Sequence, residues 1–139
     1  MIEPRQAIDR LEITSDFSSL ASCGIVIETI TEDLEAKKAV LVQVEHVVPP
    51  ETVIGSNTSA IPISIFQEGA LHPERILGIH WAEPAHITRF MEIICGDKTL
   101  PVFAERAVSF ARIWNKEPTL VRRDIRGFVT NRIMYAMLR

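Results

Sequence analysis

Short apolar runs alternate along the chain with longer stretches in which apolar residues recur every three or four positions. The run at residues 25–27 shows no apolar–polar alternation, which is typical of a strand covered on both faces. Similar runs at residues 52–54 and 119–121 predict further strands, and a short strand is expected at residues 12–14. Strands that alternate with helical patterns indicate an α/β fold with a mainly parallel sheet.

The helical stretches have recognisable boundaries. The clearest predicted helix has Thr31 as its N-cap, acidic residues in its first turn and the pair Pro49–Pro50 at its end. Apolar residues in residues 99–114 fall on one helical face, so this stretch predicts an amphipathic helix. A short helix is expected at residues 62–68, and another helix begins near Phe128.

The most informative chemistry lies in two apolar runs, at residues 76–80 and 90–94. His80 ends the first run, and Glu92 is the single carboxylate in the second. If the two strands pair, Glu92 can meet the imidazole of His80 and form a general base with its orienting partner. The alternatives are a structural histidine at a strand end and a glutamate that points outward, and residue pattern alone favours them.

Three further segments resemble a known family. They are residues 27–37 (IETITEDLEAK), residues 56–59 (SNTS) and residues 126–132 (RGFVTNR), with His80 and Glu92 in order between them. From about Leu11 to the C-terminus the chain resembles L-3-hydroxyacyl-CoA dehydrogenase, the NAD-dependent enzyme of fatty-acid β-oxidation. The resemblance implies NAD as the cofactor, an acyl-CoA substrate, and a homo-oligomer, a dimer, in the complete protein.

The resemblance also implies an α/β, Rossmann-like, doubly wound fold that is incomplete. Residues 1–122 would form part of the NAD-binding domain, and residues 123–139 would start the C-terminal helical domain. A dinucleotide fold begins with a strand and a Gly-x-Gly-x-x-Gly turn, whereas the six glycines here are scattered through the chain. We therefore expect a fragment that lacks the first two strands and the Gly-rich turn, is inactive alone, and is poorly soluble or oligomeric because an apolar strand becomes an edge.

Residue roles follow from the same resemblance. His80 matches the base that takes the proton of the substrate's C3 hydroxyl, and Glu92 matches its partner. Ser59 and Asn131 match residues that hold the substrate, and Ser59 also lies near the nicotinamide. The expected cofactor-binding set is Glu28, Thr29, Ile30, Glu35, Ser59 and Glu83. Without the resemblance, ordinary roles are favoured for three of these residues: Ser59 as a turn cap, Asn131 as a first-turn residue of its helix and Glu28 as a solvated strand end.

Two departures from the family pattern bear on the substrate. Residues 81–84 read WAEP where the family usually has two aromatic residues and then Asn-Pro, so Glu83 places a carboxylate where an amide is expected. A second carboxylate near His80 would favour the imidazolium. Residues 86–89 (HITR) replace a stretch that is usually apolar, which puts the specificity for an acyl chain in question.

Composition excludes several classes of protein and partner. The hydrophobic fraction of 47% is ample for a core, and a net charge of -3 without a basic cluster argues against nucleic acid. No apolar run approaches the ~20 residues of a membrane span, and the first residues lack a secretory segment, so we expect a cytoplasmic protein with no membrane partner. Cys23 and Cys95 are too few for a disulfide scaffold.

Rival functions differ in how well the residues support them. A non-catalytic structural or interaction fragment agrees with the missing phosphate turn, and a related hydroxy-acid dehydrogenase with a different substrate shares the same frame. A serine hydrolase built on Ser59 and His80 lacks the Gly-x-Ser-x-Gly elbow. A zinc site at His80 and His86 lacks a third ligand and a shared helical face.

Overall fold

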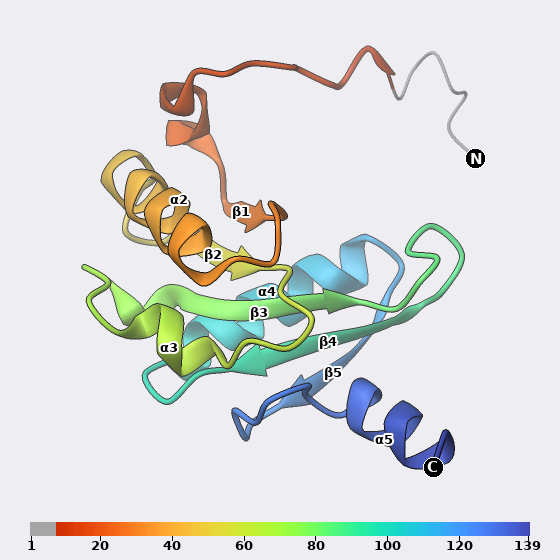
Figure 1. Ribbon diagram of the computed structural model, residues 1–139. Helices are drawn as coiled ribbons and strands as arrows, with labels where there is room; N and C mark the ends of the chain where they lie inside the picture. Colours follow the sequence, from red (N-terminus) through yellow and green to blue (C-terminus); the bar gives the residue numbers. More distant parts are fainter. Residues whose placement is uncertain (1–7) are drawn as a thin grey trace.

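A five-stranded sheet forms the centre of the computed structural model, which describes residues 8–139 (Figure 1). Residues 1–7 lie outside the described part. They include the start of the predicted first domain and the N-terminal end that was examined for a secretory segment. The elements in chain order are η1 (Phe17–Ser22), β1 (Ile25–Glu28), α2 (Leu34–Val47), β2 (Val53–Ser56), α3 (Ile63–Gln67), η2 (Pro73–Arg75), β3 (Ile76–Trp81), β4 (Phe90–Cys95), α4 (Pro101–Ile113), β5 (Glu117–Val121) and α5 (Thr130–Met137).

The strands are ordered β1-β2-β3-β4-β5, as they follow in the chain. Helical crossovers join β1 to β2 and β4 to β5, and both of these pairs are parallel, as is the pair β2–β3. The pair β3–β4 is antiparallel because only a short loop connects the two strands. The predicted α/β class with a mainly parallel sheet is therefore confirmed.

Helices cover both faces of the sheet. On one face α2 and α3 pack through Leu41, Val44, Ile63 and Phe66, and on the other α4 packs through Ala107 and Ala111. In Figure 1 α4 lies behind the sheet while α2 and α3 lie in front of it. Because both faces are covered, the central strands are mainly apolar, as the sequence pattern indicated, and Glu92 is a buried exception.

The last helix, α5, stands apart from these two layers beside β5 (Figure 1). It has no buried residue, and Ile133, Met134 and Met137 are among its exposed apolar side chains. None of the helices within residues 8–139 is long and apolar enough to span a membrane.

Two predictions near the N-terminus are wrong. Residues 12–14 form no strand, since Ile13 is 98% exposed and these residues pair with no strand of the described chain. The first long helix begins at Leu34 with Asp33 as its N-cap, rather than with Thr31, because the Asp33 carboxylate accepts the backbone N–H of Ala36 at 2.8 Å.

Candidate active site

The carboxyl ends of three neighbouring strands meet at one edge of the sheet. The strands β1, β2 and β3 run parallel and end at Glu28, Ser56 and Trp81, so residues from distant parts of the sequence come together there. Open α/β sheets bind ligands at this edge. A cavity of about 440 Å³ opens at this edge, within the usual size range of small-molecule sites. It is lined by Asn57, Ser59, His80, Trp81, Glu83, Ala85 and His86.

His80 and Glu92 form the pair that their strand positions predicted. They are direct neighbours in the antiparallel register of β3 and β4, and His80 Nδ1 lies 2.7 Å from Glu92 Oε2. The carboxylate therefore selects the tautomer with a proton on Nδ1. His80 Nε2 has no hydrogen-bond partner within residues 8–139, and the ring lines the cavity, so this nitrogen can accept a proton from a ligand.

Glu92 also connects the histidine to α5. Its second oxygen, Oε1, accepts the backbone N–H groups of Val129 at 2.9 Å and Thr130 at 3.1 Å, at the start of the helix. Just before them, Phe128 is fully buried and its ring centroid lies 5.7 Å from that of His80. The imidazole is thus held by a carboxylate on one edge and by an aromatic ring beside it.

The charged form of Glu92 is favoured despite its burial. Burial opposes ionisation, but hydrogen bonds from His80 and from the backbone of Thr130 and Val129 outweigh it, so the pKa of Glu92 lies below its ordinary value of 4.5. A carboxylate with a lowered pKa in the folded state stabilises the fold above the pKa of the unfolded chain. That contribution is lost as the pH falls through the lowered pKa.

Replacing Glu92 with Gln is expected to lower the free energy of unfolding at pH 7 by about 1.5–3 kcal/mol, because hydrogen bonds to a charged acceptor are lost. The difference from the wild type should shrink as the pH falls below the ordinary pKa of 4.5. Urea denaturation at pH values from 7 to about 3 measures it. Glu105→Gln, on the exposed face of α4, serves as the control. A Glu92→Gln deficit that is the same at every pH would contradict the assignment.

A polar network that sequence reasoning missed, buried at Lys37 and Glu28 and exposed at Glu32, holds the segment containing Ser59. Glu32 Oε1 accepts a hydrogen bond from Thr58 Oγ1 at 2.6 Å and from the backbone N–H of Ser59 at 3.0 Å. Lys37 Nζ lies 3.4 Å from Glu32 and 2.9 Å from Glu28, and it is buried with Glu28. The network therefore links the ends of β1 and β2 to the first turn of α2.

A signal for Lys37 was present in the sequence. It follows Leu34 by three residues and precedes Leu41 by four, so it lies on the helix face that packs against the sheet. A lysine on such a face needs a partner, and a strand-end carboxylate is the ordinary one. Glu28 supplies it, and its carboxylate also accepts Ser56 Oγ at 2.7 Å.

The loop between β3 and β4 forms one wall of the cavity. Lys116 Nζ donates to the backbone carbonyls of Ala85 and Thr88, the latter at 2.6 Å, and lies 5.5 Å from the centroid of the Trp81 ring. These contacts fix the loop that carries Glu83 and His86. Both side chains line the cavity, so the wall facing His80 is polar, and His86 was not among the predicted site residues.

The structure brings together part of the predicted site. Ser59, His80 and Glu83 line one cavity, and Asn131 Nδ2 donates to the backbone carbonyl of Ser59 at 2.7 Å from a second cavity. Four of the residues expected to bind the cofactor line neither cavity. Glu28 is buried in its ion pair, and the exposed residues are Thr29, Ile30 and Glu35.

Comparison with known proteins supplies a family. The family model for the NAD-binding domain of 3-hydroxyacyl-CoA dehydrogenase matches residues 2–125. The chain is 34% identical to 5-formyl-3-hydroxy-2-methylpyridine 4-carboxylate 5-dehydrogenase of Mesorhizobium japonicum, over 98% of the chain and 44% of that protein. It is 32% identical to the fatty acid oxidation complex subunit alpha of Pseudomonas putida, over 94% of the chain and 18% of that protein.

A solved structure agrees with these relatives. The (S)-3-hydroxybutyryl-CoA dehydrogenase of Ralstonia eutropha superimposes with a TM-score of 0.91 at 28% identity, over 96% of this chain and 47% of that one. The chain thus spans less than half of the length of each of these three proteins.

Proposed function

The chain belongs to the 3-hydroxyacyl-CoA dehydrogenase family, and from this we propose that it supplies the catalytic base for oxidation of an L-3-hydroxyacyl-CoA to the 3-oxoacyl-CoA. The observation that carries the proposal is the pair His80–Glu92, at 2.7 Å, in a cavity at the carboxyl ends of parallel strands. The substrate is part of the proposal, because the relatives act on different compounds according to their names.

In the proposed reaction the chain's own residues handle the proton. His80 Nε2 takes the proton of the C3 hydroxyl, while the C3–H bond breaks and a C=O bond forms. Bound NAD supplies the acceptor for the hydride that leaves C3. Glu92 stabilises the imidazolium that results, because its carboxylate already lies 2.7 Å from Nδ1. In the reverse direction His80 returns the proton to the oxygen.

Two further residues would position the substrate. Ser59 lines the same cavity as His80, where its hydroxyl can donate to the carbonyl oxygen as it forms. Asn131 contacts the backbone of Ser59 through its amide, so the start of α5 would hold the substrate from the other side. Glu92 would fix the position of His80 relative to the start of α5, since its carboxylate binds the His80 ring and the backbone N–H of Val129.

The residues present fit the nicotinamide end of NAD. The cavity of about 440 Å³ has an amide at Asn57 and a hydroxyl at Ser59, which can pair with a carboxamide. Thr29 and Ile30 follow the neighbouring strand β1 and would line the cofactor beyond it. No Gly-x-Gly-x-x-Gly turn occurs in the 139 residues, so a pyrophosphate would lack its usual cradle within this sequence.

A second candidate substrate is a smaller hydroxy or oxo acid without CoA. The polar cavity wall at Glu83 and His86 favours it, because a fatty acyl chain is better matched by apolar residues. The pyridine carboxylate named in one relative is a compound of this kind.

Reduction of acetoacetyl-CoA by NADH, followed at 340 nm, tests the proposal. We expect turnover by the complete product of the gene. For the 139-residue chain we expect weak NAD binding by calorimetry and no turnover, since a phosphate cradle is missing from its sequence. Turnover of small oxo acids but not of acetoacetyl-CoA would favour the second candidate. No turnover with either class would favour a non-catalytic module.

A further inference from the structure

A second cavity, of about 660 Å³, adjoins the one at His80. It lies between the segment at Ser59 and α5, and Ser59 lines both cavities. The helical wall carries Arg132 and Tyr135 of α5, which are three residues apart and so share one face, and Arg139 lies just beyond the end of the helix. Arg126 stands on the opposite wall.

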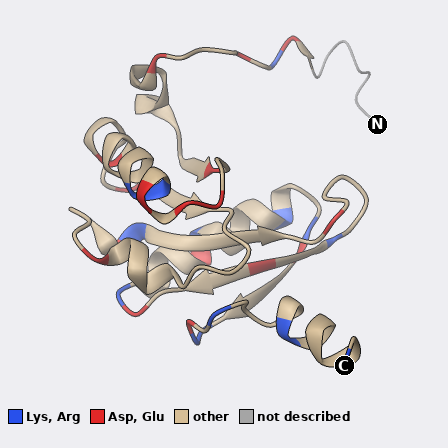
Figure 2. Cartoon of the chain, in the orientation of Figure 1, with Lys and Arg blue, Asp and Glu red and all other residues tan. Residues whose placement is uncertain are grey.

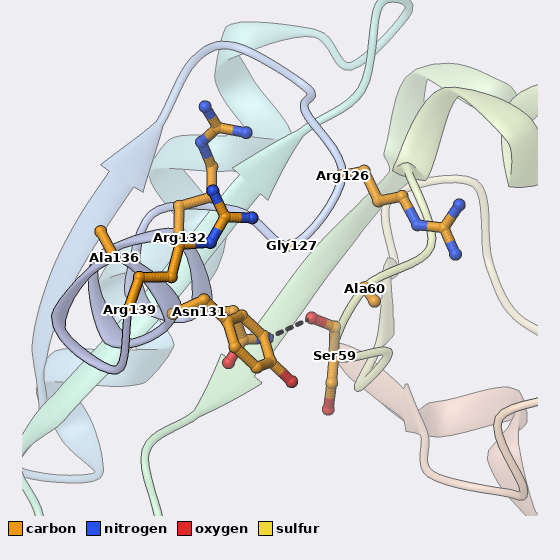
Figure 3. Close-up of a pocket in the computed structure, with 9 residues that line it drawn as sticks. Ser59, Ala60, Arg126, Gly127, Asn131, Arg132, Ala136 and Arg139 are labelled. Atoms are coloured by element: carbon orange, nitrogen blue, oxygen red, sulfur yellow. Dashed lines mark hydrogen bonds between the residues drawn. The ribbon is translucent and has the colours of Figure 1, made fainter.

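The position of this helix face is fixed. The amide of Asn131 donates to the Ser59 carbonyl at 2.7 Å, which is the dashed line in Figure 3. The backbone N–H groups of Val129 and Thr130 bind the buried carboxylate of Glu92. Arg132 follows directly, so its backbone has a set place beside Ser59.

The cavity is cationic. Arg126, Arg132 and Arg139 line it, and no acidic residue does. None of the three guanidinium groups forms an ion pair or hydrogen bond with another residue between positions 8 and 139. Figure 2 shows a basic segment but no acidic one on α5, and the basic residue of this helix is Arg132. In Figure 3 Arg132 extends from α5 and Arg139 from the residues just after it, whereas Arg126 extends from the far side of the cavity, beyond Ala60.

An acidic group beside Arg126 is already engaged. Glu32 lines a small hollow with Arg126, but its carboxylate accepts from Thr58 and Ser59 and lies 3.4 Å from Lys37 Nζ. Three like charges around one cavity repel one another, and a bound anion relieves that repulsion. Arginine is suited to this task because its planar fork matches the oxygens of a carboxylate or a phosphate.

We propose that this cavity is a subsite for an oxyanion group of the substrate, held by Arg132 and Arg126. The inference rests on the proposed function, because it takes the substrate to extend from His80 past Ser59. The anion has two possible sources, the carboxylate of a small hydroxy acid and the phosphates of CoA. Both present oxygens that guanidinium groups recognise.

Titration of the complete gene product with glutarate, as a carboxylate probe, and with CoA, as a phosphate probe, tests the subsite. NMR spectra of the backbone amides report binding at low salt. We expect Arg132→Met to raise the Kd of the recognised probe about tenfold or more, because a charge-assisted pair is lost. Arg132→Lys keeps the charge without the fork and should give a smaller rise. Arg126→Met should act in the same direction.

Arg112→Met is the matched control, since it removes the same charge from the exposed last turn of α4. Arginine-dependent binding of glutarate alone assigns the subsite to a carboxylate, and that of CoA alone assigns it to a phosphate. Equal losses in Arg112→Met and Arg132→Met, or no binding of either probe, would overturn the subsite. If the protein turns over substrate but the arginine variants do not change probe binding, the subsite is wrong and the proposed function stands. If probe binding depends on the arginines but no turnover occurs, the proposed function is wrong and the anion site stands.

Discussion

Replacing His80 with Gln in the complete gene product is expected to lower kcat for reduction of acetoacetyl-CoA by about 10²–10⁴-fold, the usual contribution of a positioned acid–base group. Gln keeps a polar side chain of similar reach but cannot take or return a proton at neutral pH. Because the loss falls on proton transfer, KM should change much less than kcat. Steady-state assays at 340 nm with saturating NADH measure both constants.

The control for this variant is His46→Gln. His46 is exposed on α2, and the hydrogen bond of its ring within residues 8–139 is with the backbone carbonyl of Val42, at 2.7 Å. Its removal should leave kcat within about twofold of the wild type, since surface changes of this kind are nearly neutral. A decrease below about tenfold for His80→Gln, with the fold intact by circular dichroism, would show that another group transfers the proton.

The sequence offered the pair at the centre of this prediction as one possibility, because it follows from strand geometry if the two strands pair, although residue pattern alone favoured structural roles for both side chains. A histidine ends one apolar run, and a lone carboxylate lies in the next run, with a loop between them short enough for an antiparallel pair. In such a pair the side chains of directly opposite residues lie on the same face. The register then places His80 opposite Glu92.

Other features depend on contacts that no local pattern contains. Glu32, which was expected in the first turn of the helix, instead precedes it and binds the backbone N–H of Ser59, 27 residues further along the chain. The strand expected at residues 12–14 does not form because a three-residue run gains its stability from a neighbouring strand, and the described chain offers none. Local propensity is a weak guide where a distant partner decides the outcome.

The strongest structural consequence of these distant contacts is expected at Lys37. Replacing it with Met should lower the free energy of unfolding by about 3–5 kcal/mol, because a buried carboxylate loses its counter-charge. Lys37 Nζ contacts both oxygens of Glu28, at 2.9 and 3.1 Å, and both side chains are 1% exposed. For a chain of this size the loss corresponds to a melting temperature lower by about 10–20 °C.

A matched control and a double variant separate the ion pair from the packing of the lysine stem. Lys38→Met changes the neighbouring residue of α2, which forms no ion pair in the described part of the chain, and should cost less than about 1 kcal/mol. Glu28→Gln combined with Lys37→Met should recover part of the stability, because the unpaired charge is then removed.

The network also holds the Ser59 segment through Glu32, at 3.4 Å from Lys37 Nζ, so amide exchange at Ser59 should quicken in Lys37→Met. Unchanged exchange at Ser59 together with a full loss of stability would confine the role of Lys37 to the fold, and the buried pair would then have no part in shaping the wall beside His80.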